Sequence, residues 1–164
     1  MIQRTALALA AVAAAIGLWY FSSRNEGPVA RLVAEPTSVS FDAQATRLTA
    51  IVNIENDGER PTVASITNAV FVDSQKQMSD ASRPQTRQIE LTPKQWTPVA
   101  FVLEGEAATA VWRGVQLMEV TITADYRESA QLNCVFSFMG RFYPEIKKMG
   151  IVSATISPRE CERR

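Results

Sequence analysis

Apolar and polar residues alternate over several short stretches of this chain, and this alternation constrains the fold more than any other feature. In residues 118–126 the apolar positions are Met118, Val120, Ile122, Ala124 and Tyr126. Successive side chains of a strand point to opposite faces, so the pattern predicts a half-buried strand with Glu119, Thr121, Thr123 and Asp125 in water. The same period places Leu48, Ala50, Val52 and Ile54 on one buried face, and Leu132, Cys134, Phe136 and Phe138 on another.

Further short strands are expected between turn-forming segments. They are predicted at residues 29–34, 38–41, 64–72, 88–91, 99–103 and 151–156, with a hairpin turn around 127–130. Pro98 indicates an edge or the beginning of a strand. Only "YPEIKKMG", residues 143–150, reads as a single helical turn. Many short strands without an amphipathic helix predict an all-β fold, an Ig-like antiparallel β-sandwich of about seven to nine strands.

One polar corner interrupts this pattern at "IENDGERPT". Asn56, Asp57 and Gly58 tolerate positive backbone torsions and satisfy their own amides, and Pro61 stops the strand. The corner is therefore expected to be a loop between the two sheets.

The N-terminal segment is uncharged from Thr5 to Phe21 and follows Arg4. It predicts one N-terminal transmembrane helix, an uncleaved signal anchor, because the apolar run continues past its small-residue cleavage sites into interfacial aromatic residues. A cleavable signal peptide is the alternative. Either way the domain lies outside the cytoplasm: on the periplasmic side of a single-pass protein of the cell inner membrane, or secreted if the leader is removed.

Three regions follow from these patterns. Residues 1–28 are the signal anchor or signal peptide with a short linker, 29–158 the Ig-like β-sandwich, and 159–164 a charged C-terminal tail. The 164 residues suit one domain of ordinary size.

Composition excludes several classes of function. Lysine plus arginine equal aspartate plus glutamate at 17 each, so no net field gathers nucleic acid. The sequence has no histidine, which removes the commonest general base and the imidazole zinc sites. We therefore expect a protein that is not an enzyme, with no cofactor and no nucleic-acid partner.

The order of the elements resembles Ig-like modules of bacterial envelope proteins, including the cell adhesion related domain found in bacteria. The resemblance covers residues 46–126 and rests on the ordered segments "VNIENDG", "NAVFVDSQ", "IELTPKQWTPVAFVL" and "GVQLMEVTITADY". Members of that group serve as binding, adhesive or spacer modules and share no catalytic residues. The resemblance therefore implies a noncatalytic role without assigning any residue.

Aromatic residues near strand ends are the candidate binding residues: Trp96, Trp112 and Tyr143. Exposed, they would stack on sugar rings or anchor a protein partner. Buried, they would cap the ends of the sandwich core instead. Both interpretations stay open, because the loops at the ends of a sandwich are where such folds place function.

Acidic residues offer only a weak metal alternative. Glu55, Asp57 and Glu59 surround a glycine turn and carry the hard oxygen ligands that calcium prefers, but Arg60 is a competing cation and a solvated turn is the default. Glu104 and Glu106 are interpreted in the same way. We therefore expect no metal site.

Two further features remain. Cys134, on an apolar strand face, and Cys161, in the tail, either form a disulfide that closes a long ring or leave an inert buried thiol. Arg141, Lys147 and Lys148 form a basic spot, either in contact with a membrane surface or simply solvated.

Together these features predict a membrane-tethered extracytoplasmic module that binds or scaffolds another protein, such as an accessory subunit of a membrane complex. The alternative function is carbohydrate binding or adhesion through exposed aromatic residues.

Overall fold

The computed structural model describes residues 30–73, 78–80 and 84–162. The strands are β1 (Leu32–Asp42), β2 (Arg47–Asn56), β3 (Thr62–Asp73), β4 (Met78–Asp80), β5 (Gln85–Leu91), β6 (Trp96–Glu104), β7 (Leu117–Arg127), β8 (Asn133–Tyr143) and β9 (Lys148–Ser157); the helices are α2 (Gly105–Trp112) and the short 3-10 helix η1 (Arg159–Glu162). The predicted anchor lies outside these residues. Among the helices that the structure describes, none has the length and apolarity to cross a membrane.

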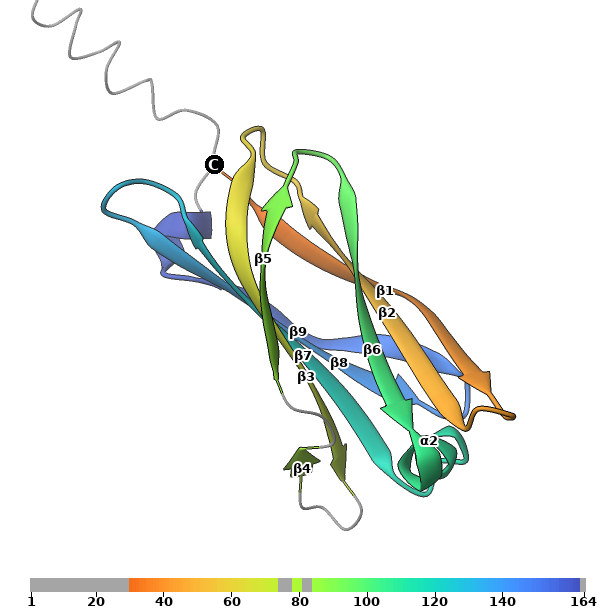
Figure 1. Cartoon of the computed structure of the whole chain (residues 1–164). Coiled ribbons are helices and arrows are strands. Elements are labelled where there is room, and N and C mark those ends of the chain that lie inside the picture. The colour runs from red at the N-terminus through yellow and green to blue at the C-terminus, as the bar shows by residue number, and fades with distance from the viewer. Residues whose placement is uncertain (1–29, 74–77, 81–83, 163–164) are drawn as a thin grey trace, which may run out of the picture.

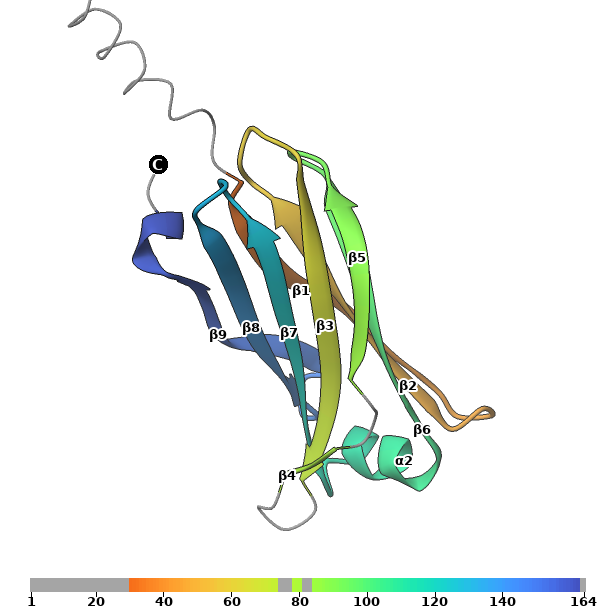
Figure 2. The ribbon, with the colours of Figure 1, turned by 60° about the vertical axis from the view of Figure 1, so that its left-hand side comes forward.

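The strands form two antiparallel sheets that pack face to face as a β-sandwich, as predicted (Figures 1 and 2). The smaller sheet has the order β1-β2-β6. The larger sheet has the order β4-β3-β7-β8-β9, and β5 pairs with β3 on the same side as β4. Pro98 lies in β6, an edge strand, where its missing N–H leaves no gap in the sheet.

The inward faces of the two sheets form the core, and the alternation in the sequence locates it. The predicted inward residues of β2 are fully buried, as are Met118, Val120, Ile122 and Ala124 of β7. Residues 57–61 carry the chain from β2 in one sheet to β3 in the other, so the predicted corner between sheets is confirmed.

The first strand is longer than predicted. Residues 29–34 and 38–41 were expected as two strands, whereas β1 runs through Pro36. The register pairs Pro36 with Val52 and Ser38 with Ile51, so Thr37 is the extra residue of a β-bulge. The Thr37 hydroxyl donates a hydrogen bond to the carbonyl oxygen of Ile51 at 3.2 Å. A bulge on an edge strand accommodates the proline without ending the strand.

The two helical assignments differ from the prediction. Residues 144–147 form the turn of the β8–β9 hairpin rather than a helical turn. The α-helix of the described residues is α2, which was not predicted, and it follows Glu104 without a side-chain cap. Gly105 opens it with a φ of 71°, a torsion that glycine adopts readily. Ala108 and Val111 are buried, so packing rather than capping holds the helix.

Glu119 contradicts the simple alternation. It was predicted to face water, but only 8% of its side chain is exposed. Arg141 lies opposite on β8, and its guanidinium donates from Nε to Glu119 Oε1 at 2.8 Å. This hydrogen bond and the charge of Glu119 raise the pKa of Arg141. The basic spot expected from Arg141, Lys147 and Lys148 is therefore partly neutralised.

Candidate functional site

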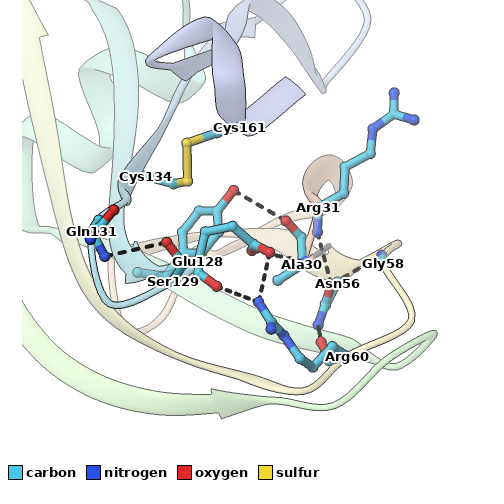
Figure 3. A network of polar contacts seen from close by, with 11 residues as sticks. Ala30, Arg31, Asn56, Gly58, Arg60, Glu128, Ser129, Gln131, Cys134 and Cys161 are labelled. Carbon is cyan, nitrogen blue, oxygen red and sulfur yellow. Dashed lines mark hydrogen bonds and ion pairs between the residues drawn. A yellow bond between two sulfur atoms is a disulfide. The ribbon is translucent and has the colours of Figure 1, made fainter. Parts of the chain in front are cut away.

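Asn56 holds the corner between the sheets together. Its side chain is fully buried. Its Oδ1 accepts from the backbone N–H groups of Arg31 at 3.1 Å and Gly58 at 3.0 Å, and its Nδ2 donates to the carbonyl oxygens of Arg60 at 2.7 Å and Leu91 at 3.1 Å (Figure 3). One amide thus satisfies four backbone groups from three parts of the chain.

The torsions expected at the corner are found elsewhere. Among the described residues, positive φ occurs at Thr46, Lys94, Lys147, Gly105 and Gly114, and not in the corner. The corner is held by the hydrogen bonds of the Asn56 side chain, without a residue of positive φ.

Asp57, one of the three acidic residues of the corner, lies between two cationic side chains. Asp57 Oδ1 accepts from Lys94 Nζ at 2.6 Å, and its Oδ2 lies 4.0 Å from Arg31. No group of three acidic, cysteine or histidine side chains suited to a metal ion occurs in the part of the chain that the structure describes. Glu104 also has a cationic partner, because its Oε1 accepts from Arg47 Nε at 2.8 Å.

Glu128 connects the beginning of β1 to the β7–β8 turn. Its Oε2 accepts from the backbone N–H of Ala30 at 3.1 Å, and its Oε1 accepts from Arg60 at 2.6 Å (Figure 3). The Tyr126 hydroxyl donates to the carbonyl oxygen of Ala30 at 3.4 Å. Burial, reinforced by the charge of Glu128, raises the pKa of Tyr126 to about 12. We call Ala30, Asn56, Arg60, Tyr126 and Glu128 the corner network.

A disulfide lies beside this network. Cys134 of β8 and Cys161 of η1 are bonded, with a Cα–Cα distance of 5.9 Å (Figure 3). Both cysteines are buried. The bond fixes the segment that follows β9 to the neighbouring strand β8.

Trp112 lies at the opposite end of the sandwich, at the end of α2. Its ring stacks between Phe41, at a centroid distance of 5.3 Å, and Phe142, at 5.9 Å. Lys147 lies over the ring at 4.2 Å from the centroid and donates to the Trp112 carbonyl oxygen. Of the two roles expected for Trp112, the structure shows the core cap.

Three exposed apolar side chains gather at this same end. Tyr143 ends β8, Ile146 lies in the β8–β9 turn, and Val115 follows α2; their exposed fractions are 39%, 63% and 72%. The turns meet because Gly114 packs against Pro144, where an added Cβ would lie 3.1 Å from Pro144 Cγ. We call Val115, Tyr143 and Ile146 the end patch. Val115 also lines a groove of about 410 Å³ beside α2.

The predicted aromatic residues do not form one site. Trp96 is 46% exposed, but it begins β6 in the smaller sheet and pairs with Glu55, next to the corner, whereas Tyr143 ends β8 in the larger sheet. Val115 and Ile146 were missed by sequence reasoning. The only signal for them was a single apolar residue within each of two polar turns, "RGVQ" and "PEIKK".

An open seam separates the edge strands β1 and β9. A groove of about 420 Å³ lies between them, with Leu32, Ala34, Phe136, Ala154 and Ile156 among its lining residues. Ile151 and Val152 of β9 are exposed next to it. The larger sheet therefore ends in β9, which pairs with β8 alone among the described strands and lies beside β1 across this groove.

Comparisons with known proteins reach only distant structures. No family model and no curated protein matches the chain, so the resemblance to the cell adhesion related domain stays a prediction. The solution structure of CsgH from R. palustris is 14% identical, with a TM-score of 0.42 over 71% of this chain and 95% of that one. The putative ApaA protein from Bordetella pertussis is 10% identical, with a TM-score of 0.43 over 78% and 93%. At these values neither likeness carries a conclusion about function.

Proposed function

We propose that this chain is a noncatalytic Ig-like module that binds another protein outside the cytoplasm while its N-terminal segment tethers it to the inner membrane. The observation that carries the binding role is the end patch. Three exposed apolar side chains lie in or beside two turns that meet at Gly114 and Pro144, and such a grouping favours an interaction site. If the leader is cleaved, the same module acts as a secreted protein.

The disulfide supports an extracytoplasmic location. Disulfides persist in oxidising compartments such as the periplasm and are rare in the cytosol. Cys134 and Cys161 are bonded in the fold, and the uncharged segment from Thr5 to Phe21 provides the route across the membrane.

The end patch lies at the end of the sandwich opposite the tether. Ala30 is held at the corner by Glu128 and Tyr126, whereas α2 and the turn with Ile146 lie at the other end (Figure 2). A membrane anchor before Ala30 would therefore leave the end patch directed away from the membrane. This position suits an accessory subunit that reaches a partner's extracytoplasmic domain.

Copurification from a mild detergent extract tests the proposal. We expect a partner protein with the full chain and its loss with Ile146→Lys, because a lysine removes apolar contact and adds charge within the end patch. Val63→Lys is the matched control, since Val63 is 57% exposed against 63% for Ile146 but lies near the corner. Equal recovery of the partner with both variants would remove the end patch as the binding site.

Carbohydrate is the competing ligand class. A glycan array probed with the full chain distinguishes it, because Trp96 and Tyr143 are the exposed rings of the candidate set. We expect no glycan signal. Binding that disappears with Trp96→Ala or Tyr143→Ala would replace the protein-binding proposal with the carbohydrate one.

A further inference from the structure

The free edge of β9 is the least protected sheet edge in the described part of the chain. Natural edge strands are blunted by charge, proline, bulges or shortness. β1 carries Glu35 and Pro36, β5 carries Arg87 and Glu90, β6 carries Pro98, and β4 is three residues long. From Met149 to Ser157, β9 has no charged residue and no proline. Its one protection is a bulge, since the register with β8 shifts at Val152.

The run after this bulge, Ser153–Ser157, is a regular strand with one hydroxyl face and one apolar face. Ala154 and Ile156 pair with Phe138 and Phe136 and line the seam groove. Ser153, Thr155 and Ser157 alternate with them and are exposed, and Thr155 also lines the groove. Among the described strands β9 pairs with β8 alone, so its other edge offers backbone N–H and C=O groups to a further strand.

We propose that this edge binds a second copy of the same chain, with the two β9 strands antiparallel about a two-fold axis at Thr155. This register places Ala154 opposite the copy's Ile156, a small residue against a larger one, and Ser153 opposite the copy's Ser157. The nearest charged residues, Lys148 and Arg159, fall outside the paired run, and no like charges meet. A two-fold contact between identical patches is the commonest form of protein oligomer.

Two features favour this short pairing. The Cys134–Cys161 disulfide fixes the chain just beyond Ser157, so the edge is held in position before it pairs. The tether of the proposed function, on which this point rests, holds two copies in one membrane and raises their effective concentration. A five-residue pairing that is weak in solution is strengthened in this way.

Cysteine cross-linking of the full chain in its membrane tests the pairing. The native cysteines are bonded to each other, so one added cysteine is the only expected free thiol. We expect Thr155→Cys to give a covalent dimer with a short thiol cross-linker. Thr86→Cys is the matched control, because Thr86 lies at the opposite edge of the same sheet. The two positions are connected by successive cross-strand pairs, from Thr86 through Thr67, Thr123 and Ser137 to Thr155. It should stay monomeric.

Charge variants at Thr155 distinguish a specific two-fold pairing of β9 from non-specific cross-linking between copies that collide in the membrane. Two lysines, or two glutamates, introduced in place of Thr155 would face each other across the axis, so differently tagged copies of T155K, or of T155E, should lose self-copurification. Mixed T155K and T155E copies should recover it several-fold. A monomeric T155C chain, or charge variants that copurify equally in every combination, would overturn the pairing.

These outcomes are separate from those of the proposed function. If T155C cross-links to a different protein, the edge binds another partner and the self-pairing is wrong. If the Ile146-dependent partner is retained while T155C stays monomeric, the proposed function stands without this inference.

Discussion

Tyr126 is the residue that couples the corner network to pH. Its pKa is raised from 10.0 to about 12 by burial and by the charge of Glu128. Below pH 10 the hydroxyl is protonated in both the folded and the unfolded chain, so its full stabilisation is present. Between pH 10 and about 12 the unfolded chain ionises and the folded chain does not. We therefore expect the free energy of unfolding to fall by roughly 2 to 3 kcal/mol over this window.

Tyr126→Phe is the control for this prediction. Phenylalanine keeps the packing and removes the titrating hydroxyl, whereas the other basic and phenolic groups are unchanged. The difference in unfolding free energy between the two proteins, followed by circular dichroism in denaturant, isolates Tyr126. A difference that stays constant from pH 9 to pH 12 would show that the hydroxyl titrates alike in both states.

For single residues, the sequence predicted where a turn lies better than it predicted the hydrogen-bond partners of each side chain. The corner at Asn56 was evident from turn chemistry, and its own-amide bond to Gly58 was expected. Its bonds to Arg31 and Leu91 were not, because they join residues far apart in sequence. Glu119 was misplaced for the same reason: alternation assigns a face, and only the cross-strand neighbour Arg141 explains how a carboxylate becomes buried.

The disulfide acts at the scale of one element, the end of β9. It closes a ring across a sequence separation of 27 residues, which is worth about 3 to 4 kcal/mol in the chain-entropy treatment. We expect the Cys134→Ser, Cys161→Ser double variant to lose about this much stability. This loss lowers protection throughout the domain, and a further local loss is expected in η1 and the last residues of β9, because Val135 and Ser157 pair next to the bond.

Hydrogen exchange of the full chain, read by mass spectrometry, measures this effect. β2 is the internal reference, since it is the central strand of the smaller sheet and contains neither cysteine. Uniform loss of protection over β2 and β9 would mean that the disulfide stabilises the whole domain equally rather than this edge.

Elements with strong periodicity were predicted well, and short elements were not. Strand β2 follows its alternating pattern, and β7 does so except at Glu119. Helix α2 was missed because it is eight residues long and has no side-chain cap, so neither periodicity nor capping marks it. The expected helical turn at residues 144–147 failed because Pro144 suits a hairpin turn as well as a helix start.

At the scale of the whole molecule, the β-sandwich followed from sequence, but the arrangement of its surfaces did not. The strand pattern indicates which residues face inward, yet the gathering of Val115 with Ile146 depends on how two turns pack at Gly114 and Pro144. Trp96 and Tyr143 look equivalent in the sequence, but Trp96 lies next to the corner in the smaller sheet and Tyr143 at the β8–β9 turn of the larger sheet.

The orientation of the chain across the membrane is the last property of the whole molecule that these features predict. Under the proposed function, a domain that is stabilised by a disulfide and preceded by an uncharged segment after Arg4 is expected on the oxidising side. We expect a C-terminal alkaline phosphatase fusion to be active, because that enzyme needs its own disulfides, and a fusion to a protein that fluoresces only in the cytosol to be dark. Deleting residues 2–28 is the control and should reverse both signals. A fluorescent full-length fusion would place the domain in the cytoplasm, where neither the tethered function nor a stable Cys134–Cys161 bond is expected.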